Sequence, residues 1–407
     1  MTDLAITLTD AVRATMEDTY RHLHAHPELS MQEHATAELI GERLHALRIE
    51  TFVCGGTGVV GVLANGAGPT VAFRADHDGL PIAEASGVEY ASSARGTLAD
   101  GTDVPVMHGC GHDSHVAVLL AVAELLVGAR DAWAGTVVLI FQPGEETAAG
   151  ARAMLADGLW DRAPRPEVVF GQHVGPMRTG TVELTKGDAM AMADSLKVTV
   201  RGRGAHGSSP QDSIDPIILG VNMINRIQTI VSREVPPLQP AVVTVATFHA
   251  GLKENIIADS AEFTVNIRTL DPGVRKLVNT SLRRIINAEA AASGAPEPLI
   301  EELYTFPRNY NDPHATEAAA EALRGVLGED DVVWAPPMMG SEDFGLLAEA
   351  IGVPSVFWMF GGHPAERLAN GEPVPGNHSP FFAPVIEPTL ATGVRAAMAA
   401  ILSRVGR

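Results

Sequence analysis

The segment at residues 107–115, Met-His-Gly-Cys-Gly-His-Asp-Ser-His, gathers metal-binding side chains at the start of an apolar helical pattern over 116–123. Its two glycines let the backbone turn freely around Cys110. The pattern predicts a bent loop that directs ligands inward, followed by a helix that begins near Asp113 or Ser114, since both are good N-caps. A thiolate close to a helix N-terminus is stabilised by the free amides there. We interpret the segment as a metal site; a buried cysteine in a polar loop is the alternative.

The composition indicates a globular protein of more than one domain. The chain has 407 residues, of which 46% are hydrophobic and 19% charged, which suits about two or three packed domains and excludes a disordered chain. Its 29 basic and 49 acidic residues give a formal net charge of −20, which argues against a nucleic-acid partner.

Cysteine usage and the N-terminal residues favour a cytoplasmic protein. Cys54 and Cys110 are the only cysteines, as expected in a reducing compartment without a disulfide framework. The first residues show no basic region followed by a long apolar run, so we expect no signal peptide. No stretch approaches the roughly 18 apolar residues of a membrane span, so we expect no membrane association.

Short continuous apolar runs alternate with helical patterns along much of the chain. Such runs are typical of strands buried on both faces of a mostly parallel sheet that helices cover. We therefore predict an α/β open sheet. Its strands are expected at 70–73, 136–141, 168–170 and 355–360, and its helices at 7–25, 33–47, 114–127, 148–157 and 343–350.

A segment with a different pattern, 190–303, interrupts this sheet. It predicts the order βαββαβ, a ferredoxin-like unit, with one packed and one polar face on its first strand. We predict a catalytic metal-binding domain at 1–189 and 304–407, with 190–303 inserted into it. The expected elements of the insertion lie at 194–202, 214–232, 241–249, 259–269, 272–292 and 297–302.

Candidate metal ligands follow the predicted buried strands. In open α/β sheets, ligands bind beyond the carboxyl ends of the strands. Separate segments therefore deliver ligands to one predicted crevice, and this convergence is a stronger signal than any single motif. The side chains concerned are Asp76, His77, Asp78, Glu145, Glu146, His173 and, near the end of the chain, His378.

The adjacent carboxylates of Glu145 and Glu146 are costly neighbours if both are buried and ionised. A metal ion removes that cost for one of them and leaves the other as a general base on water. The alternative is a pair of solvated glutamates at a helix start, where acidic residues are favoured anyway.

Other polar residues carry weaker signals. His206 on its own is expected to be an ordinary loop histidine. His77, His108 and His115 lie near the predicted crevice, and no role is assigned to them. Residues 340–344 are expected to open a helix with a capping serine.

Taken together, the motifs resemble those of peptidase family M20, and within it the amidohydrolases of subfamily D. That group includes hippurate hydrolases, N-acyl-amino-acid amidohydrolases and plant auxin-conjugate hydrolases. The similar segments cover nearly the whole chain in family order. They are RHLHAHPELSMQE (21–33), FRADHDGLPI (73–82), MHGCGHDSHVAVLL (107–120), FQPGEETAAGARAM (141–154), GQHVGP (171–176), GRGAHGSSP (202–210), NIRTLDP (266–272), MGSEDF (339–344) and NHSP (377–380).

The resemblance implies a site for two divalent metal ions per subunit. Cys110 corresponds to the bridging ligand. His112 and His173 would complete one metal site, and Glu146 and His378 the other. The thiolate and imidazole ligands favour zinc; manganese, cobalt and nickel are alternatives.

The resemblance also implies roles away from the metal ions. Glu145 corresponds to the general base, and Asp78 to a carboxylate that orients a ligand histidine. His206 corresponds to a histidine that stabilises the oxyanion in the partner subunit's active site. Asn255 and Arg268 correspond to residues near the substrate carboxylate. The inserted domain would act as a lid and a dimerisation domain, so we expect a homodimer or a higher homo-oligomer.

Four residues depart from the family pattern and border the expected pocket. His77 stands where methionine is usual, Gly79 where alanine is usual, and Gly144 and Thr147 flank the paired glutamates in place of alanine and glycine. None of them removes a ligand or the base, so they bear on substrate identity rather than on activity.

We therefore expect a metal-dependent amidohydrolase that cleaves N-acyl amino acids, of the hippurate or N-acetyl type, to a carboxylic acid and a free amino acid. The first alternative is a dipeptidase or a deacetylase of an N-acylated intermediate of amino-acid biosynthesis. A more distant alternative is a non-catalytic protein that binds acyl amino acids.

Overall fold

The structure, a computed structural model, describes residues 7–369 and 373–407. This part of the chain divides into two compact units. The first unit contains the chain as far as Ala189, with Tyr310–Pro336 and Asp343–Arg407. The second unit contains Met190–Asn309 and Pro337–Glu342.

These units differ from the predicted domains at 304–309 and 337–342, which lie in the second unit. Strand β15 (Leu299–Phe306) extends beyond the predicted boundary, because it pairs with its neighbour as far as Phe306. Residues 337–342 are bound by Arg268, whose guanidinium donates hydrogen bonds to the Met339 carbonyl at 2.9 Å and the Ser341 hydroxyl at 3.2 Å.

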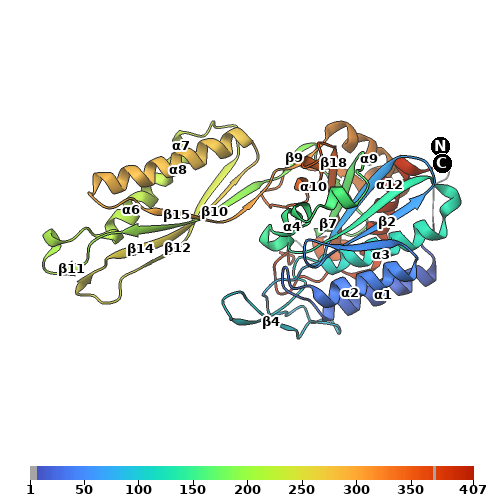
Figure 1. The fold of residues 1–407 in the computed structure, drawn as a ribbon, viewed down its shortest axis with the longest axis horizontal. Helices are drawn as coiled ribbons and strands as arrows, with labels where there is room; N and C mark the ends of the chain where they lie inside the picture. Colours follow the sequence, from blue (N-terminus) through green and yellow to red (C-terminus); the bar gives the residue numbers. More distant parts are fainter. Residues whose placement is uncertain (1–6, 370–372) are drawn as a thin grey trace. The chain divides into compact units, whose positions relative to one another are not determined.

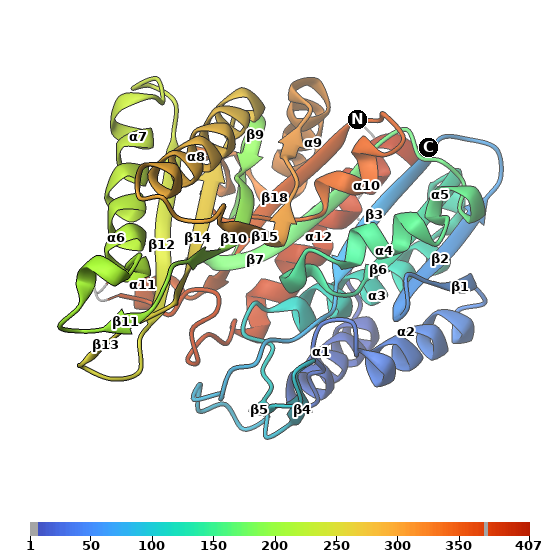
Figure 2. The same ribbon diagram turned by 60° about the vertical axis from the view of Figure 1, so that its left-hand side comes forward.

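The first unit is built on a mixed eight-stranded sheet in the order β1-β2-β6-β3-β7-β18-β8-β17. Its four central strands run parallel to one another and are the four that the apolar runs predict (Figure 2). The predicted α/β class is confirmed. The strands are β1 (Glu50–Cys54), β2 (Gly58–Asn65), β3 (Thr70–Asp76), β6 (Gly135–Gln142), β7 (Val169–Arg178), β8 (Val182–Leu184), β17 (Val332–Trp334) and β18 (Ser355–His363).

Helices cover both faces of this sheet. On β7, Gln172 donates a hydrogen bond to the carbonyl of Gly393 in α12, while a Cβ on the neighbouring Gly171 would lie 2.8 Å from Phe344, just before α10. Successive strand residues point to opposite faces, so α12 and α10 lie on opposite sides. The helices are α1 (Asp10–Ala25), α2 (His34–Ala46), α3 (His112–Gly128), α4 (Gly150–Ala156), α5 (Leu159–Arg162), α9 (Pro313–Leu327), α10 (Gly345–Glu349), α11 (Ala365–Ala369) and α12 (Ile386–Val405).

Helix α3 begins two or three residues earlier than the sequence predicts. Its first residue is His112, and its N-cap is Gly111 in the left-handed conformation, with φ of 83°, rather than Asp113 or Ser114. A side chain cannot replace glycine here, because a Cβ would lie 2.4 Å from the Val174 side chain. The bend predicted around the cysteine is therefore present.

The second unit is a four-stranded antiparallel sheet in the order β12-β14-β10-β15, with helices on one face (Figure 1). Its main elements follow the predicted order βαββαβ. Alternate residues of its first strand, Leu196, Val198 and Val200, are buried against those helices. The elements are β10 (Met192–Arg201), β11 (Ala205–His206), α6 (Pro216–Ile227), α7 (Thr229–Arg233), β12 (Ala241–Ala250), β13 (Ile256–Ile257), β14 (Ser260–Thr269), α8 (Pro272–Ala292) and β15.

Among the described residues of both units, no helix combines the length and the apolar character that a membrane span needs.

Candidate metal centre

The predicted metal ligands from separate segments lie together near the carboxyl ends of the central strands. Sγ of Cys110 lies 3.4 Å from Nε2 of His173. Nε2 of His378 lies 3.3 Å from Oε2 of Glu146, and Nε2 of His112 lies 3.9 Å from Oε1 of the same glutamate. Ligand atoms of Cys110, Glu146 and His378 all lie within 4.8 Å of one another. The structure thus brings together all five side chains that the resemblance assigns to metal binding.

Two of these histidines are held so that the same ring nitrogen faces the cluster. Nδ1 of His112 lies 3.0 Å from Oδ1 of Asp78, and Nδ1 of His173 donates to the carbonyl of Val174 at 2.7 Å. Carboxylates and carbonyls only accept, so each Nδ1 carries a proton, and Nε2 is the ring nitrogen left to bind a metal ion. Proteins orient metal-binding imidazoles in this way. Asp78 therefore has the geometry predicted for a residue that orients a ligand.

Asp78 also supports the turn that carries the paired glutamates. Its Oδ2 accepts the backbone N–H of Glu146 at 3.0 Å and the hydroxyl of Ser30 at 2.7 Å. Glu145 and Glu146 begin a single 3-10 turn, Glu145–Thr147, separated by two residues from the end of β6. Glu145 is buried, and its carboxylate lies within 4.8 Å of ligand atoms of Glu146 and His112. A buried carboxylate beside the ligand cluster is the arrangement that a general base requires.

The charges of the cluster fit bound cations. Burial, and then the carboxylates of Glu146 and Glu145, raise the pKa of the Cys110 thiol well above its usual value. Oε1 of Glu146 and Nε2 of His112 are buried and have no hydrogen-bond partner in the described part of the chain. A cation would stabilise the thiolate and the carboxylates and would satisfy both atoms. Thiolate, imidazole and carboxylate donors are a set suited to transition metals.

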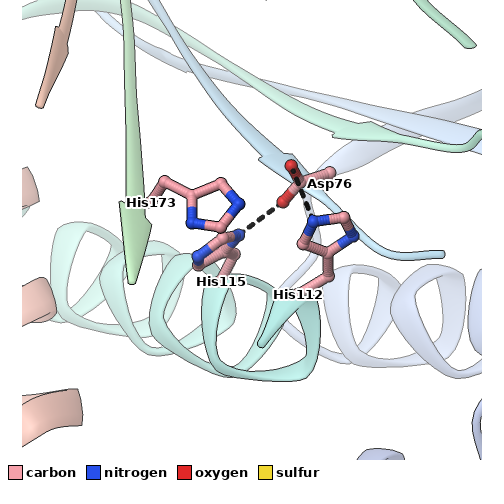
Figure 3. Close-up of side chains that lie close together, drawn as sticks. All are labelled: Asp76, His112, His115 and His173. Atoms are coloured by element: carbon pink, nitrogen blue, oxygen red, sulfur yellow. Dashed lines mark hydrogen bonds and ion pairs between the residues drawn. The ribbon is translucent and has the colours of Figure 1, made fainter. Parts of the chain in front are cut away.

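Figure 3 shows a neighbouring group formed by Asp76, His112, His115 and His173, whose ligand atoms also lie within 4.8 Å of one another. His115 has both ring nitrogens engaged: Nδ1 donates to Oδ1 of Asp76, and Nε2 accepts the N–H of Val174 at 2.8 Å. His115 therefore supports Asp76 and the backbone next to His173. The sequence alone does not indicate this role of His115, because the helical pattern around it conceals the contact.

Asp343 is a buried residue that sequence analysis missed. The expected serine-capped helix start at 340–344 is wrong, because α10 begins at Gly345 without a side-chain cap. Instead, Asp343 accepts hydrogen bonds from Arg74 at 3.2 Å and from Gln142 at 2.6 Å, and burial raises its pKa to about 6. Arg74 also donates to Asp76 at 2.7 Å, which connects Asp343 to the group in Figure 3. The family-like segment at 339–344 was the one signal for this residue.

Three predicted residues belong to the second unit. His206 is exposed, and its Nδ1 lies 2.7 Å from the hydroxyl of Ser208. The carbonyl of Asn255 accepts the N–H of Gly207 at 2.8 Å, so Asn255 lies beside the loop of His206. Arg268 lies on β14. Their roles in oxyanion and carboxylate binding stay predictions.

His24 forms a buried ionic link at the start of α3. Nδ1 lies 2.6 Å from Oδ2 of Asp113, and Nε2 lies 2.9 Å from Oε1 of Glu84, with all three side chains buried. Burial lowers the pKa of His24, but the carboxylates of Asp113 and Glu84 outweigh burial and raise the pKa to about 10.

Replacing His24 by glutamine is expected to destabilise the protein by about 3–5 kcal/mol at pH 6.5, because two buried carboxylates lose their cation. The His24 pKa is raised on folding, so its stabilisation is complete below the unfolded pKa of about 6.5 and declines as the pH rises through about 10. Urea unfolding of the metal-free proteins measures the difference at pH 6.5 and at pH 9.5. The difference should shrink at the higher pH; a constant or growing difference contradicts the ionic link. Exposed His45 replaced by glutamine is the control.

The comparisons with known proteins agree with this fold. A model of the family described as Peptidase family M20/M25/M40 matches residues 72–403. Thermostable carboxypeptidase 2 of Saccharolobus solfataricus is 38% identical over 349 residues, which cover 84% of each chain. N-acetylcysteine deacetylase of Bacillus subtilis is 38% identical over 344 residues, and hippurate hydrolase of Campylobacter jejuni is 36% identical over 342 residues; each alignment covers 83% of this chain and 86% of the relative.

Solved structures of related proteins have the same fold as this chain. A crystal structure from methicillin-resistant Staphylococcus aureus superposes with a TM-score of 0.85 at 32% identity and covers 99% of both chains. The YXEP protein of Bacillus subtilis, described as a dinuclear metal-binding peptidase from the M20 family, gives a TM-score of 0.76 at 31% identity, over 97% of this chain and 99% of that one.

The fold and the donor cluster define a metal-dependent amide hydrolase, and the His, Cys and carboxylate groups fit two metal ions. The chain belongs to peptidase family M20/M25/M40. The family resemblance seen in the sequence is confirmed.

Proposed function

We propose that the protein hydrolyses the amide bond of N-acyl amino acids and releases a carboxylic acid and a free amino acid. The observation that carries the proposal is the buried Glu145 carboxylate beside a cluster of thiolate, imidazole and carboxylate ligands. The names of two relatives, a hippurate hydrolase and an N-acetylcysteine deacetylase, support this substrate class.

We propose that the metal ions are bound as the family resemblance implies. Cys110 would be a ligand of both ions, His112 and His173 would hold one of them, and Glu146 and His378 would hold the other. Zinc suits the thiolate and imidazole donors best, with manganese, cobalt and nickel as alternatives. When bound, the ions supply Lewis-acid activation of a water molecule and of the amide carbonyl.

The side chains then have separate tasks. Glu145 accepts a proton from the attacking water and delivers it to the amine nitrogen as the carbon–nitrogen bond breaks. Asp78 holds His112 in one tautomer. His206 donates a hydrogen bond to the oxyanion in the partner subunit's site. The substrate carboxylate is bound by Arg268, whose guanidinium suits bidentate contact, together with Asn255.

The assembly and location of the protein are also proposals. The inserted domain, predicted at 190–303, would join copies of the chain into a homodimer or a higher homo-oligomer, as the family resemblance implies. A cytoplasmic location is favoured by the use of two free cysteines and no disulfide.

A peptidase activity is the second candidate. The relative named Thermostable carboxypeptidase 2 is as similar to this chain as the deacetylase, at 38% identity. Peptide and N-acyl amino acid substrates share an amide next to a free carboxylate, so the metal centre and Arg268 would serve either.

A substrate panel tests the proposal. Purified protein reconstituted with zinc, and separately with manganese or cobalt, is assayed on hippurate, N-acetyl amino acids and dipeptides. We expect kcat/KM for the best N-acyl amino acid to exceed that of any dipeptide by at least about tenfold. The methyl ester of the same substrate is the control, and it should be cleaved much more slowly because it lacks the carboxylate. Faster hydrolysis of dipeptides would establish the peptidase instead.

A further inference from the structure

Glu33, at the start of α2, is a buried carboxylate that the proposed mechanism does not use. Its side chain is 0% exposed. Oε1 accepts the backbone N–H groups of Met31 and Gly144, both at 2.8 Å, and Oε2 accepts the hydroxyl of Thr57 at 2.5 Å. Three hydrogen bonds thus compensate the burial of this carboxylate.

The two N–H groups on Oε1 belong to two unusual turns. Met31 has φ of 63° and Gly144 has φ of 54°, so both have the left-handed conformation, which non-glycine residues rarely adopt. The turns also pack on each other, because a Cβ on Gly144 would lie 2.5 Å from Sδ of Met31. Glu33 therefore joins two turns that are far apart in the sequence.

Gly144 directly precedes the proposed base. The carbonyl of Gly144 accepts the N–H groups of Ala149 and Gly150, both at 3.1 Å. The backbone of Gly144 therefore connects the residue before Glu145 to the residues that follow the turn. On the other side of the base, the N–H of Glu146 is bound by Asp78.

The segment 30–33 helps to hold the backbone on both sides of Glu145. Ser30 donates to Asp78, which binds the N–H of Glu146, and Glu33 binds the N–H of Gly144. The backbone on each side of Glu145 is thus fixed by the same short segment.

We propose that Glu33 is a positioning residue that fixes the Glu145 carboxylate beside the metal ligands. It touches neither substrate nor a proposed metal ligand and acts through the Gly144 peptide. The inference rests on the proposed role of Glu145 as the base.

Two replacements of Glu33 separate positioning from charge. Glu33→Gln keeps an oxygen for the two N–H groups and places an amide N–H near the Thr57 hydroxyl, which can accept it. Glu33→Ala removes all three bonds. Thr57→Val is the matched control, because it removes only the bond on Oε2 and leaves Gly144 bound.

The first measurement needs no substrate. Hydrogen exchange of the metal-free proteins is followed for the peptide that contains residues 144–150. We expect exchange at least about tenfold faster in Glu33→Ala than in the wild type, with near-wild-type rates in Glu33→Gln and Thr57→Val. Equal rates in all four proteins, or equal acceleration in Glu33→Ala and Thr57→Val, would overturn the proposal.

The second measurement is steady-state kinetics on the best substrate of the panel at saturating metal. We expect Glu33→Ala to lower kcat by about 10–100-fold with little change in KM or in metal content, and Glu33→Gln to restore most of kcat. A higher KM with unchanged kcat, or no rescue by glutamine, would contradict positioning. If instead Glu145→Gln is fully active, the base assignment fails, whereas the exchange result still reports on the Glu33 contact.

Discussion

Replacing Glu145 by glutamine is expected to lower kcat by about 10²–10⁴-fold while the protein keeps its metal ions. Glutamine has nearly the same shape as glutamate but cannot accept a proton at neutral pH, so water is no longer activated and the leaving amine is not protonated. KM should change little, because the substrate carboxylate is bound elsewhere. The measurement is steady-state kinetics together with metal analysis of the same preparation.

Glu146, a proposed metal ligand, should respond differently from Glu145 to the same replacement. Oε1 of Glu146 has no hydrogen-bond partner in the described residues, and Oε2 lies 3.3 Å from Nε2 of His378. We therefore expect Glu146→Gln to lose metal as well as activity. Exposed Glu42 replaced by glutamine controls for the loss of one surface charge. Activity close to wild type in Glu145→Gln would show that Glu145 is not the base.

The second large effect is expected at Cys110. Replacement by alanine removes the proposed bridging ligand, so both metal ions should bind at least about 100-fold more weakly, since even the loss of a residue that only orients a ligand costs 10–100-fold. By contrast, His173→Ala removes a ligand of one ion only. Titration of the metal-free variants with zinc should therefore show both sites weakened in the first variant and one in the second.

Cys54 supplies the control for this experiment. It is the other cysteine of the chain, it is buried, and its thiol donates to the carbonyl of Met154 at 3.3 Å rather than facing the cluster. Cys54→Ala should bind zinc like the wild type. If Cys110→Ala binds two ions with wild-type affinity, the bridging role is wrong.

Much of the fold follows from local patterns in the sequence. The central strands, such as β6 at Gly135–Gln142, are continuous apolar runs because they are buried on both faces. Other elements lack such a pattern. Most of α12 is buried, so its apolar residues do not form the single stripe that marks a surface helix. The edge strand β1 has only five residues, most of them exposed or half-buried, and it resembles a loop in the sequence.

The candidate site likewise contains residues that the sequence predicts and residues that it does not. Cys110 and Glu145 occur in compact motifs, because neighbouring residues of one loop supply the chemistry. The supports come from elsewhere in the chain: the Val174 carbonyl orients His173, Arg74 reaches Asp343, and His24 reaches Asp113. These contacts depend on how distant segments pack, which no local spacing encodes. A histidine that pairs with two acids and one that lies on the surface look alike in the sequence.

The metal centre is assembled from segments far apart along the chain, and this determines when it can be completed during synthesis. A nascent chain that has emerged as far as His173 already contains Cys110 and His112, one full set of three proposed donors. His378 is made only after the whole second unit has been translated. Because a domain generally folds as a unit, and β18, the sheet neighbour of the His173 strand β7, is also made after the second unit, we expect neither metal site to form stably before the C-terminal segment has emerged.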